Sequence, residues 1–297
     1  MKFTYNDFEI LTTIEREKRE LSQRDISELT DLSLGTVNKS ITTFLNEKLI
    51  TEKNIITAKG LKYLEPYRVK RAIFLAAGFG YRLVPLTINT PKPLIKVHGK
   101  RMIETLLDAV VKADIKEIII VTGYLGEQFD VLTKKYPNIK FVENEKYNDA
   151  NNILSAYLVR DKLKNAYVLE SDLVLSNPNL IRKYEYNSNF LGIKVDRTDD
   201  WCLETKNGII TKQRVGGTNC FQMVGVSYYD AEDGEKLSKD IKEVYELPGG
   251  KEKYWEQVQL DVKKNNYQIH IRECKKDDII EIDTFNELKA IDSIYDV

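Results

Sequence analysis

The sequence is poor in cysteine and histidine. Of its 297 residues, only three are cysteine and two are histidine. Cys202, Cys220 and Cys274 are odd in number and form no CxxC pair, so they indicate no disulfide framework, which is usual for a reducing cytoplasm. His98 and His270 are too few to suggest a histidine-rich metal site or a Ser-His-Asp triad.

Long apolar runs and an excess of charge of one sign are also missing. No stretch approaches the ~18 apolar residues that span a bilayer, and the opening MKFTYNDFEI lacks the apolar core of a signal peptide. The formal net charge of −1 argues against a chain that binds nucleic acid or anionic membrane through its overall charge. We therefore expect a cytoplasmic protein without a membrane partner, long enough for about two domains.

Residues 1–68 have the pattern of short helices joined by short loops. Ser22 and Ser33 each precede a helical pattern that they can cap, and Thr57 can cap a further helix. Between them, LITEKNIIT predicts two short strands around a charged turn. This order of elements resembles a winged helix-turn-helix domain, and the resemblance implies that the helix over 34–46 enters the major groove of DNA.

The charge of this segment gives DNA binding only limited support. Residues 1–70 carry 12 Lys and Arg against 11 Asp and Glu, and the expected recognition helix offers a single cation, Lys39. Phosphate contacts dominate affinity for DNA, so this is little charge for the purpose. Two interpretations stand: the domain binds DNA, or it serves dimerisation or docking.

Residues 69–297 alternate between strand and helix patterns. The runs RAIFLAA, KEIIIVTG, IKFVEN and AYVLESD predict strands, and MIETLLDAVVKA, LGEQFDVLTKKY and NNILSAYLVRDKL predict helices between them. This alternation predicts an α/β, Rossmann-like domain with a mixed, mainly parallel sheet covered on both faces. Further on, the pattern predicts a hairpin turn at Asn207-Gly208, a helical stretch over 231–264, a strand near 267–273 and a helix near 284–292.

A glycine-rich loop, LAAGFGYRLVPLTINTPKPL, follows the first of these strands. The backbone N–H groups around Gly78 and Gly80 can approach an anion closely. The dinucleotide fingerprint GxGxxG is not met, because Leu83 stands where a third glycine would be, and the P-loop motif is absent. Arg82 and Lys92 add a guanidinium and an ammonium, so a single loop offers several donors to one polyphosphate.

This loop resembles the signature LAAGxGxRLxPLTxxxPKPL of the nucleotidyltransferase family that includes the sugar-1-phosphate nucleotidylyltransferases. The resemblance implies that a phosphate oxygen of an acceptor attacks the α-phosphorus of a nucleoside triphosphate, and that pyrophosphate leaves without a covalent enzyme intermediate. It implies catalytic roles for two residues: Arg82 would bind the β- and γ-phosphates, and Lys92 would neutralise charge at the α-phosphate.

Acidic residues close two further segments. Asp172 ends the strand pattern LESD, with Glu170 two residues earlier on the same strand face, and IIEID supplies Glu281 and Asp283. By themselves these patterns are equally compatible with exposed strand ends. Carboxylate oxygens are ligands that Mg²⁺ prefers. The family resemblance implies a Mg²⁺ site formed by Asp172 and Asp283, with Glu170 beside them and Glu281 as the alternative second ligand.

The whole segment 70–297 resembles the bacterial CTP:phosphocholine cytidylyltransferases. The landmarks are VTGYLGEQFD, NEKYNDANN, AYVLESD, DDWCLE, VGVSYYDA, KYWEQV and IIEID. The resemblance implies CTP and phosphocholine as substrates and CDP-choline and pyrophosphate as products. The alternatives are another amino-alcohol phosphate, an aminoalkyl phosphonate or a sugar-1-phosphate as acceptor, or a transcription regulator that senses CTP or CDP-choline.

Both tryptophans of the chain stand beside acids. A quaternary ammonium cannot donate a hydrogen bond and is best held by aromatic faces with a carboxylate nearby. The acceptor-binding candidates are Trp201, Tyr228, Tyr229, Tyr245, Tyr254 and Trp255. The nucleotide-binding candidates are Ala76, Ala77, Gly78, Gly80, Gly123, Tyr124, Asn151 and Asn152, of which the two asparagines can equally be helix caps.

Overall fold

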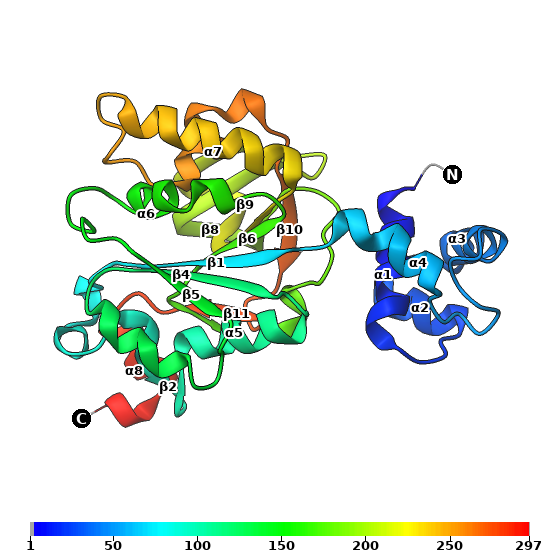
Figure 1. Cartoon of the computed structure of the whole chain (residues 1–297), viewed down its shortest axis with the longest axis horizontal. Helices are drawn as coiled ribbons and strands as arrows, with labels where there is room; N and C mark the ends of the chain where they lie inside the picture. The colour runs from blue at the N-terminus through cyan, green and yellow to red at the C-terminus, as the bar shows by residue number, and fades with distance from the viewer. Residues whose placement is uncertain (1–2, 297) are drawn as a thin grey trace. The chain divides into compact units, whose positions relative to one another are not determined.

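The computed structural model describes residues 3–296 and divides into two compact units (Figure 1). The first unit runs to Arg68 and also takes in Tyr184–Tyr186, a short segment that the sequence did not assign to it. The second unit comprises Val69–Lys183 and the chain from Asn187 onward. Over 3–296, no helix combines the length and the apolar character that crossing a membrane would require.

The first unit is built from four helices. They are α1 (Tyr5–Glu17), α2 (Gln23–Thr30), α3 (Leu34–Asn46) and α4 (Ala58–Leu64), followed by the 3₁₀ turn η1 (Glu65–Tyr67). The predicted caps are confirmed, because Ser22, Ser33 and Thr57 each accept a hydrogen bond from the backbone N–H three residues on. The predicted pair of strands after α3 is wrong in extent: it consists of one bridge, between Ile50 and Ile56.

One apolar face of each helix makes the core of this unit. Val37, Ile41 and Phe44 recur at helical spacing in α3 and are buried against residues of α1 such as Phe8 and Leu11. Burying side chains of this size contributes roughly 1.5–3 kcal/mol each, which is what holds so small a unit together.

The second unit is centred on a seven-stranded sheet with the order β10-β8-β9-β6-β1-β4-β5. The strands are β1 (Arg71–Ala76), β4 (Glu117–Thr122), β5 (Ile139–Glu143), β6 (Ala166–Glu170), β8 (Asn189–Lys206), β9 (Ile209–Tyr229) and β10 (His270–Cys274). β1 pairs in parallel with β4 and β6, β4 with β5 and β10 with β8, whereas β9 is antiparallel to its neighbours. The predicted mixed, mainly parallel sheet is confirmed.

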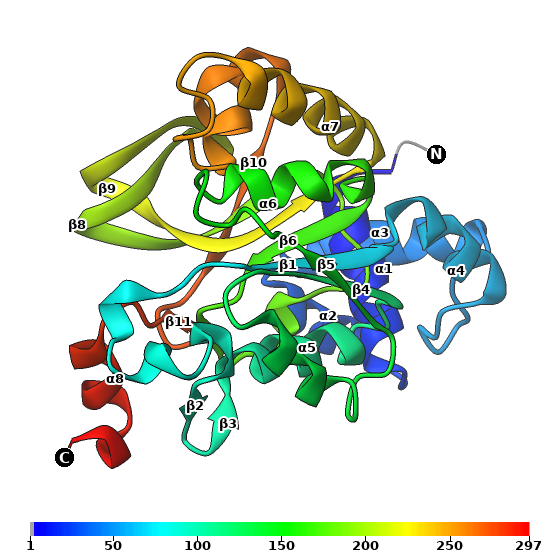
Figure 2. The same cartoon turned by 60° about the vertical axis from the view of Figure 1, so that its left-hand side comes forward.

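Helices cover both faces of this sheet, as Figures 1 and 2 show. The helix α5 (Met102–Lys112) lies on one face, and α6 (Ile153–Leu158) and α7 (Ala231–Glu246) lie on the other. Residues of β1 alternate between the two cores: Phe74 packs with α5, and Ile73 and Leu75 pack with α6 and α7. A strand buried on both faces is therefore apolar throughout, as its sequence is.

Two small strand pairs complete the unit. β2 (Lys96–Val97) pairs with β3 (Lys100–Arg101), and β7 (Leu173–Leu175) pairs antiparallel with β11 (Ile279–Glu281). The β7–β11 pairing positions the site, because it brings the chain after β11 beside Asp172, whose carbonyl accepts from the N–H of Ile282 at 3.2 Å. The last helix is α8 (Phe285–Ile291).

Three predicted helices differ from the structure. The helix predicted over NNILSAYLVRDKL is shorter: α6 ends at Leu158, and a 3₁₀ turn, Arg160–Lys162, follows. The helical stretch predicted over 231–264 is wrong in extent: α7 ends at Glu246, where the chain continues as Leu-Pro-Gly-Gly, and only a π-helix (Val258–Val262) and a 3₁₀ turn (Lys264–Asn266) follow. The helix predicted over 125–136 is a 3₁₀ helix, Gly126–Leu132. The Asn207-Gly208 turn is confirmed, with positive φ at both residues.

Candidate active site

A cavity of about 710 Å³ opens at the carboxyl ends of the parallel strands β1 and β6. This is where open α/β sheets bind their ligands. Its walls come from the glycine loop, the chain before α6, the ends of β6 and β11, and the arm formed by β8 and β9. The lining residues include Gly78, Gly80, Arg82, Lys92, Glu170, Asp172, Trp201, Tyr254, Glu256, Glu281 and Asp283.

At one position, Gly80, the glycine loop has a conformation that favours glycine. Gly80 has φ of 75°, and a Cβ there would lie 3.0 Å from the Cβ of Lys92. The hydroxyl of Thr87 donates to the carbonyl of Gly80 at 3.1 Å, and Leu83 is fully buried beneath the loop. At Gly78, by contrast, a Cβ would meet nothing within 4 Å, so this part of the backbone faces open space where an anion can approach.

Arg82 and Lys92 converge on two carboxylates. The Nζ atom of Lys92 lies 2.8 Å from Asp172 Oδ2 and 2.9 Å from Asp283 Oδ1, and Arg82 Nη2 lies 2.7 Å from the same Asp283 oxygen. Burial alone would lower the pKa of Lys92, but the two carboxylates raise it above its ordinary value. Lys92 is therefore a buried, fixed cation, whereas Arg82 is largely exposed and free to turn toward a ligand.

Three acidic side chains gather next to this pair. Single carboxylate oxygens of Glu170, Asp172 and Glu281 lie within 4.8 Å of one another. Burial raises the pKa of Glu170 and of Glu281 well above the ordinary value, and the neighbouring carboxylates add to the effect. Among the described residues, Asp172 Oδ1 is buried without a hydrogen-bond partner. A buried oxygen that lacks a partner, beside carboxylates that repel one another, fits a hard divalent cation such as Mg²⁺.

Asp283 stands slightly apart from this group. The sequence placed it with Asp172 as a metal ligand, but its oxygen is engaged by Lys92 and Arg82, and Glu281 is the residue that joins the group of three. The arrangement therefore places both Glu170 and Glu281, which the sequence left as secondary candidates, in the acidic cluster.

Part of the cavity lining is aromatic and acidic. The rings of Trp201 and Tyr254 lie 5.8 Å apart, edge to face at 70°. Glu256 also lines the cavity although it is 3% exposed, and its charge adds to the effect that raises the pKa of Glu170. Within the described part of the chain its Oε2 atom has no hydrogen-bond partner. Burial raises the pKa of Glu256 to about 7, and a hydrogen bond from Asn152 acts in the opposite direction. Aromatic rings with carboxylates nearby fit the head of an organic cation.

Sequence reasoning missed Glu256 as a site residue. Its only local signal is its position after two aromatic residues in KYWEQV, a pattern that does not reveal which way the carboxylate points. Asn152, which was expected to contact a ligand, lines the cavity and also accepts from the N–H of Trp255 at 2.8 Å, so it fixes the segment that carries Glu256.

The nucleotide candidates divide into lining and supporting residues. The lining group is Ala76, Ala77, Gly78, Gly80, Asn151 and Asn152. Gly123 and Tyr124 stand behind the loop: the N–H of Tyr124 donates to the carbonyl of Ala77 at 3.1 Å, and a Cβ on Gly123 would lie 2.7 Å from that oxygen. Phe79 extends the wall with its ring 4.5 Å from that of Tyr124.

Four aromatic candidates for the acceptor do not line the cavity. Tyr228 is buried against Tyr167, and Tyr229 packs against Trp255, which is itself buried in the core shared with α6 and α7. Tyr245 packs against Tyr157. Their large apolar rings are used for packing, so the acceptor set reduces to Trp201 and Tyr254.

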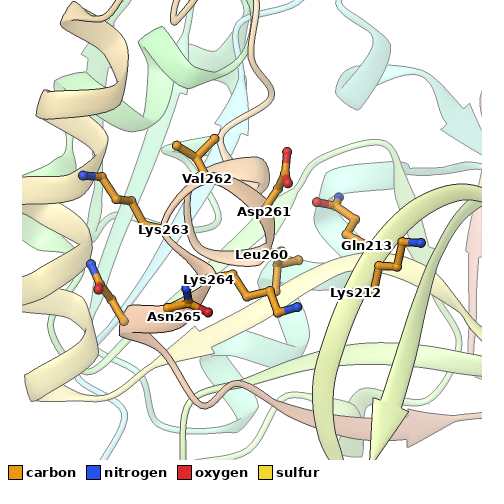
Figure 3. A pocket seen from close by; sticks show the side chains of 9 residues that line it. Lys212, Gln213, Leu260, Asp261, Val262, Lys263, Lys264 and Asn265 are labelled. Carbon is orange, nitrogen blue, oxygen red and sulfur yellow. The ribbon is translucent and has the colours of Figure 1, made fainter.

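A second cavity, of about 560 Å³, lies elsewhere in the same unit (Figure 3). Lys212 and Gln213 of β9 form one side, and the segment Leu260–Asn266 forms the other. It shares no lining residue with the first cavity, and nothing connects it with the convergence of Lys92, Asp172 and Asp283.

A glycine loop, a fixed lysine and an acidic cluster at the carboxyl ends of parallel strands are the parts that nucleotidyl transfer needs. The chain belongs to the nucleotidyl transferase family, whose model matches residues 71–214. A second family model, of winged helix-turn-helix DNA-binding domains, matches residues 3–51. Both resemblances predicted from the sequence are confirmed.

The relatives of known activity extend this match over the rest of the transferase unit. The chain is 37% identical over 229 residues to the 2-aminoethylphosphonate cytidylyltransferase of Lancefieldella rimae, covering 75% of this chain and 92% of that protein. It is 34% identical over 226 residues to the choline-phosphate cytidylyltransferase of Streptococcus pneumoniae, covering 75% and 97%. The solved structure of a CTP:phosphocholine cytidylyltransferase from Streptococcus pneumoniae matches with a TM-score of 0.70 at 36% identity, covering 76% of this chain and 99% of that one.

Proposed function

We propose that the protein transfers CMP from CTP to phosphocholine and so forms CDP-choline and pyrophosphate. The observation that carries the proposal is that one cavity is lined both by Arg82 and Lys92 of the glycine loop and by the Trp201–Tyr254 pair. A triphosphate and a small phosphorylated cation can therefore meet in this cavity. Relatives named as cytidylyltransferases support the choice of CTP.

The chain's own residues provide positioning and charge. The phosphate group of the acceptor is anionic and is itself the nucleophile, so the transfer needs no side-chain nucleophile. Lys92, held by Asp172 and Asp283, meets the charge that develops at the α-phosphate. Arg82, which is exposed, exchanges its contact with Asp283 for the β- and γ-phosphates.

The acidic cluster would hold the metal. Glu170, Asp172 and Glu281 supply the oxygens of a Mg²⁺ site, and the partnerless Oδ1 of Asp172 is the atom that fits this role best. When bound, Mg²⁺ neutralises negative charge on the phosphates and orients them.

A second acceptor class is favoured by one specific feature. The buried Oε2 atom of Glu256, which has no hydrogen-bond partner among the described residues, can accept a hydrogen bond from a primary ammonium. A trimethylammonium group has no N–H to donate. The relative from Lancefieldella rimae is named for such an acceptor. An aminoalkyl phosphonate is therefore the alternative substrate to phosphocholine.

Pyrophosphate release from CTP and Mg²⁺ distinguishes the two acceptors. Phosphocholine is expected to support turnover, and Trp201→Ala should raise its KM about tenfold, as expected from the loss of a cation–π contact of ~1–2 kcal/mol. Glu256→Gln should impair a primary amine more than phosphocholine. Tyr245→Ala removes an aromatic ring that does not line the cavity and is the matched control. Turnover with 2-aminoethylphosphonate but not with phosphocholine would overturn the acceptor assignment.

We also propose that the winged helix-turn-helix unit binds DNA through α3. The exposed face of α3 carries Asn38, Lys39, Thr42 and Asn46, all able to make polar contacts, while Val37, Ile41 and Phe44 are turned inward. The match of this segment to winged helix-turn-helix DNA-binding domains supports the assignment.

A further inference from the structure

Two thiols meet in the arm formed by β8 and β9, which Figure 2 shows as two long strands side by side. Cys202 of β8 and Cys220 of β9 are both buried and unbonded. A Cβ atom built on Gly217 would lie 2.7 Å from the Sγ atom of Cys202 and 3.1 Å from that of Cys220. Both sulfur atoms therefore converge on one point, which is open because residue 217 is glycine.

The strand pairing explains how these residues come together. Cys202 faces Arg214 on one stretch of β9 and Gln222 on another, so its segment lies between two parts of the same partner strand. Gln222 is two residues from Cys220, on the same strand face. The pairing shifts register between Thr198 and Trp201 and again at Cys202. Such irregularities interrupt the ladder locally and bend the strand.

The arm also carries part of the acceptor pocket. Trp201 lines the cavity and directly precedes Cys202, whose side chain lies on the opposite face of the strand. Anything that fixes Cys202 against Cys220 therefore fixes the backbone that presents Trp201.

The surroundings of Cys202 favour its protonated form. Burial, together with the neighbouring Cys220 thiol, raises the pKa of Cys202 to about 11, and the guanidinium of Arg214 acts in the opposite direction. Since the thiolate is the reactive form, attack requires the arm to open toward solvent, where Arg214 favours the charged sulfur.

We propose that Cys202 and Cys220 form a reversible disulfide that locks the β8–β9 arm and alters binding of the acceptor. The oxidant is a low-molecular-weight disulfide. One cysteine thiolate attacks it and releases one thiol, leaving a mixed disulfide on the protein. The second cysteine then attacks that protein sulfur, the Cys202–Cys220 bond forms and a second thiol leaves. Two protein thiols are oxidised, one small disulfide is reduced, and both protons end on the released thiols.

The cross-link itself is measured without reference to activity. The full-length protein is incubated with oxidised glutathione, alkylated, digested and mapped by mass spectrometry. The expected result is a peptide pair joined through Cys202 and Cys220, with Cys274 remaining a free thiol that alkylates after denaturation. Glutathione adducts without any linked peptide, or three unreacted thiols, would overturn the proposal.

Variants test the geometry. Cys202→Ser and Cys220→Ser should each abolish the linked peptide, and Cys274→Ser is the matched control that should keep it. Gly217→Ala retains both thiols but inserts a Cβ at 2.7 Å from Cys202 Sγ, so the linked peptide should fall several-fold. Thermal unfolding checks that each variant is folded. If Gly217→Ala does not fold, the two serine variants decide.

The effect on the acceptor rests on the proposed function. Oxidation should change the KM for phosphocholine several-fold, leave the KM for CTP unchanged and be reversed by a dithiol reductant. The same treatment should leave Cys202→Ser unaffected. An unchanged KM in fully cross-linked protein would overturn the regulatory role. Failure of the proposed function looks different, because the reduced protein would then show no turnover at all.

Discussion

At the scale of single residues, the site depends on a cation held between acids. Lys92 is buried between Asp172 and Asp283, and its long stem is packed beneath the glycine loop. Such a side chain serves both the reaction and the local fold, because removing it leaves two carboxylates without their cation. A useful substitution therefore keeps the stem and removes only the charge.

Lys92→Met is expected to lower kcat by about 10²–10³ because it removes charge stabilisation at the transferring phosphate. Circular dichroism and binding of CTP check that the variant is folded and retains the rest of the pocket. Lys96→Met removes a nearby exposed lysine and should leave kcat unchanged. A near-normal rate in Lys92→Met would remove this residue from the mechanism.

A second prediction at this scale concerns acid stability. Asp108 lies 2.6 Å from Lys100 and 2.9 Å from Lys135, and it accepts from the hydroxyl of Tyr136 at 2.7 Å. Burial opposes ionisation, but these partners lower the pKa of Asp108 to about 2. The folded pKa is depressed, so the stabilisation is complete above the ordinary value of 3.8 and is lost as pH falls toward 2.

Asp108→Asn should therefore unfold at a lower temperature than the parent at pH 6, by a small amount because the cluster is partly exposed. The difference should narrow below pH 4. This trend is tested by measuring Tm of both proteins from pH 6 to pH 2.5. The control is Asp149→Asn, because Asp149 is exposed and outside any ion pair among residues 3–296. A difference in Tm that does not vary with pH would contradict the assignment.

At the scale of elements, the sequence predicts what local patterns determine. Capping serines and the apolar face of α3 mark the helices of the first unit, and the continuous apolar runs mark the parallel strands. Asp172 follows from its place at a strand end. The sequence does not predict where the side chains of Glu256 and Tyr228 point, because this depends on contacts with distant parts of the chain. In the structure Glu256 lines the cavity and Tyr228 is buried in the core. The end of α7 at Glu246 does have a local signal, the Pro-Gly-Gly that follows.

The junction between α4 and the Ile50–Ile56 bridge gives a prediction for one element. A Cβ on Gly60 would lie 2.3 Å from the carbonyl oxygen of Leu49, which belongs to the backbone and cannot easily move. Gly60→Ala should destabilise the first unit by ~1–3 kcal/mol. Gly35→Ala in α3 is the matched control, since its nearest neighbour is 4.0 Å away and alanine favours the helix by up to ~1 kcal/mol.

Urea unfolding of the full chain measures this difference. Both tryptophans lie in the transferase unit, so their fluorescence reports that unit, while far-UV circular dichroism reports both. Gly60→Ala should introduce an early phase in the circular dichroism transition, and Gly35→Ala should not. Equal transitions in the two variants would show that α4 tolerates the extra methyl group.

At the scale of the whole molecule, one chain joins a transferase to a winged helix-turn-helix unit. The net charge of −1 means that general attraction to DNA is weak. Any binding must come from local contacts on α3, where Lys39 is the one lysine or arginine. The number of phosphate contacts is then small, and the salt dependence of affinity should be shallow.

Binding of the full-length protein to the DNA upstream of its own gene, measured by fluorescence anisotropy at several salt concentrations, tests this. Lys39→Ala should weaken binding to all sequences and reduce the slope of log K against log salt by about 1, because one phosphate contact is lost. Asn38→Ala should instead reduce preference for the specific sequence while keeping the slope. Binding to unrelated DNA with the same affinity and slope would show that the unit does not recognise this sequence, and no binding at all would overturn the DNA-binding proposal in favour of dimerisation or docking. The transferase activity, measured in the same variants, should be unchanged, because α3 contributes no residue to the cavity at the ends of β1 and β6.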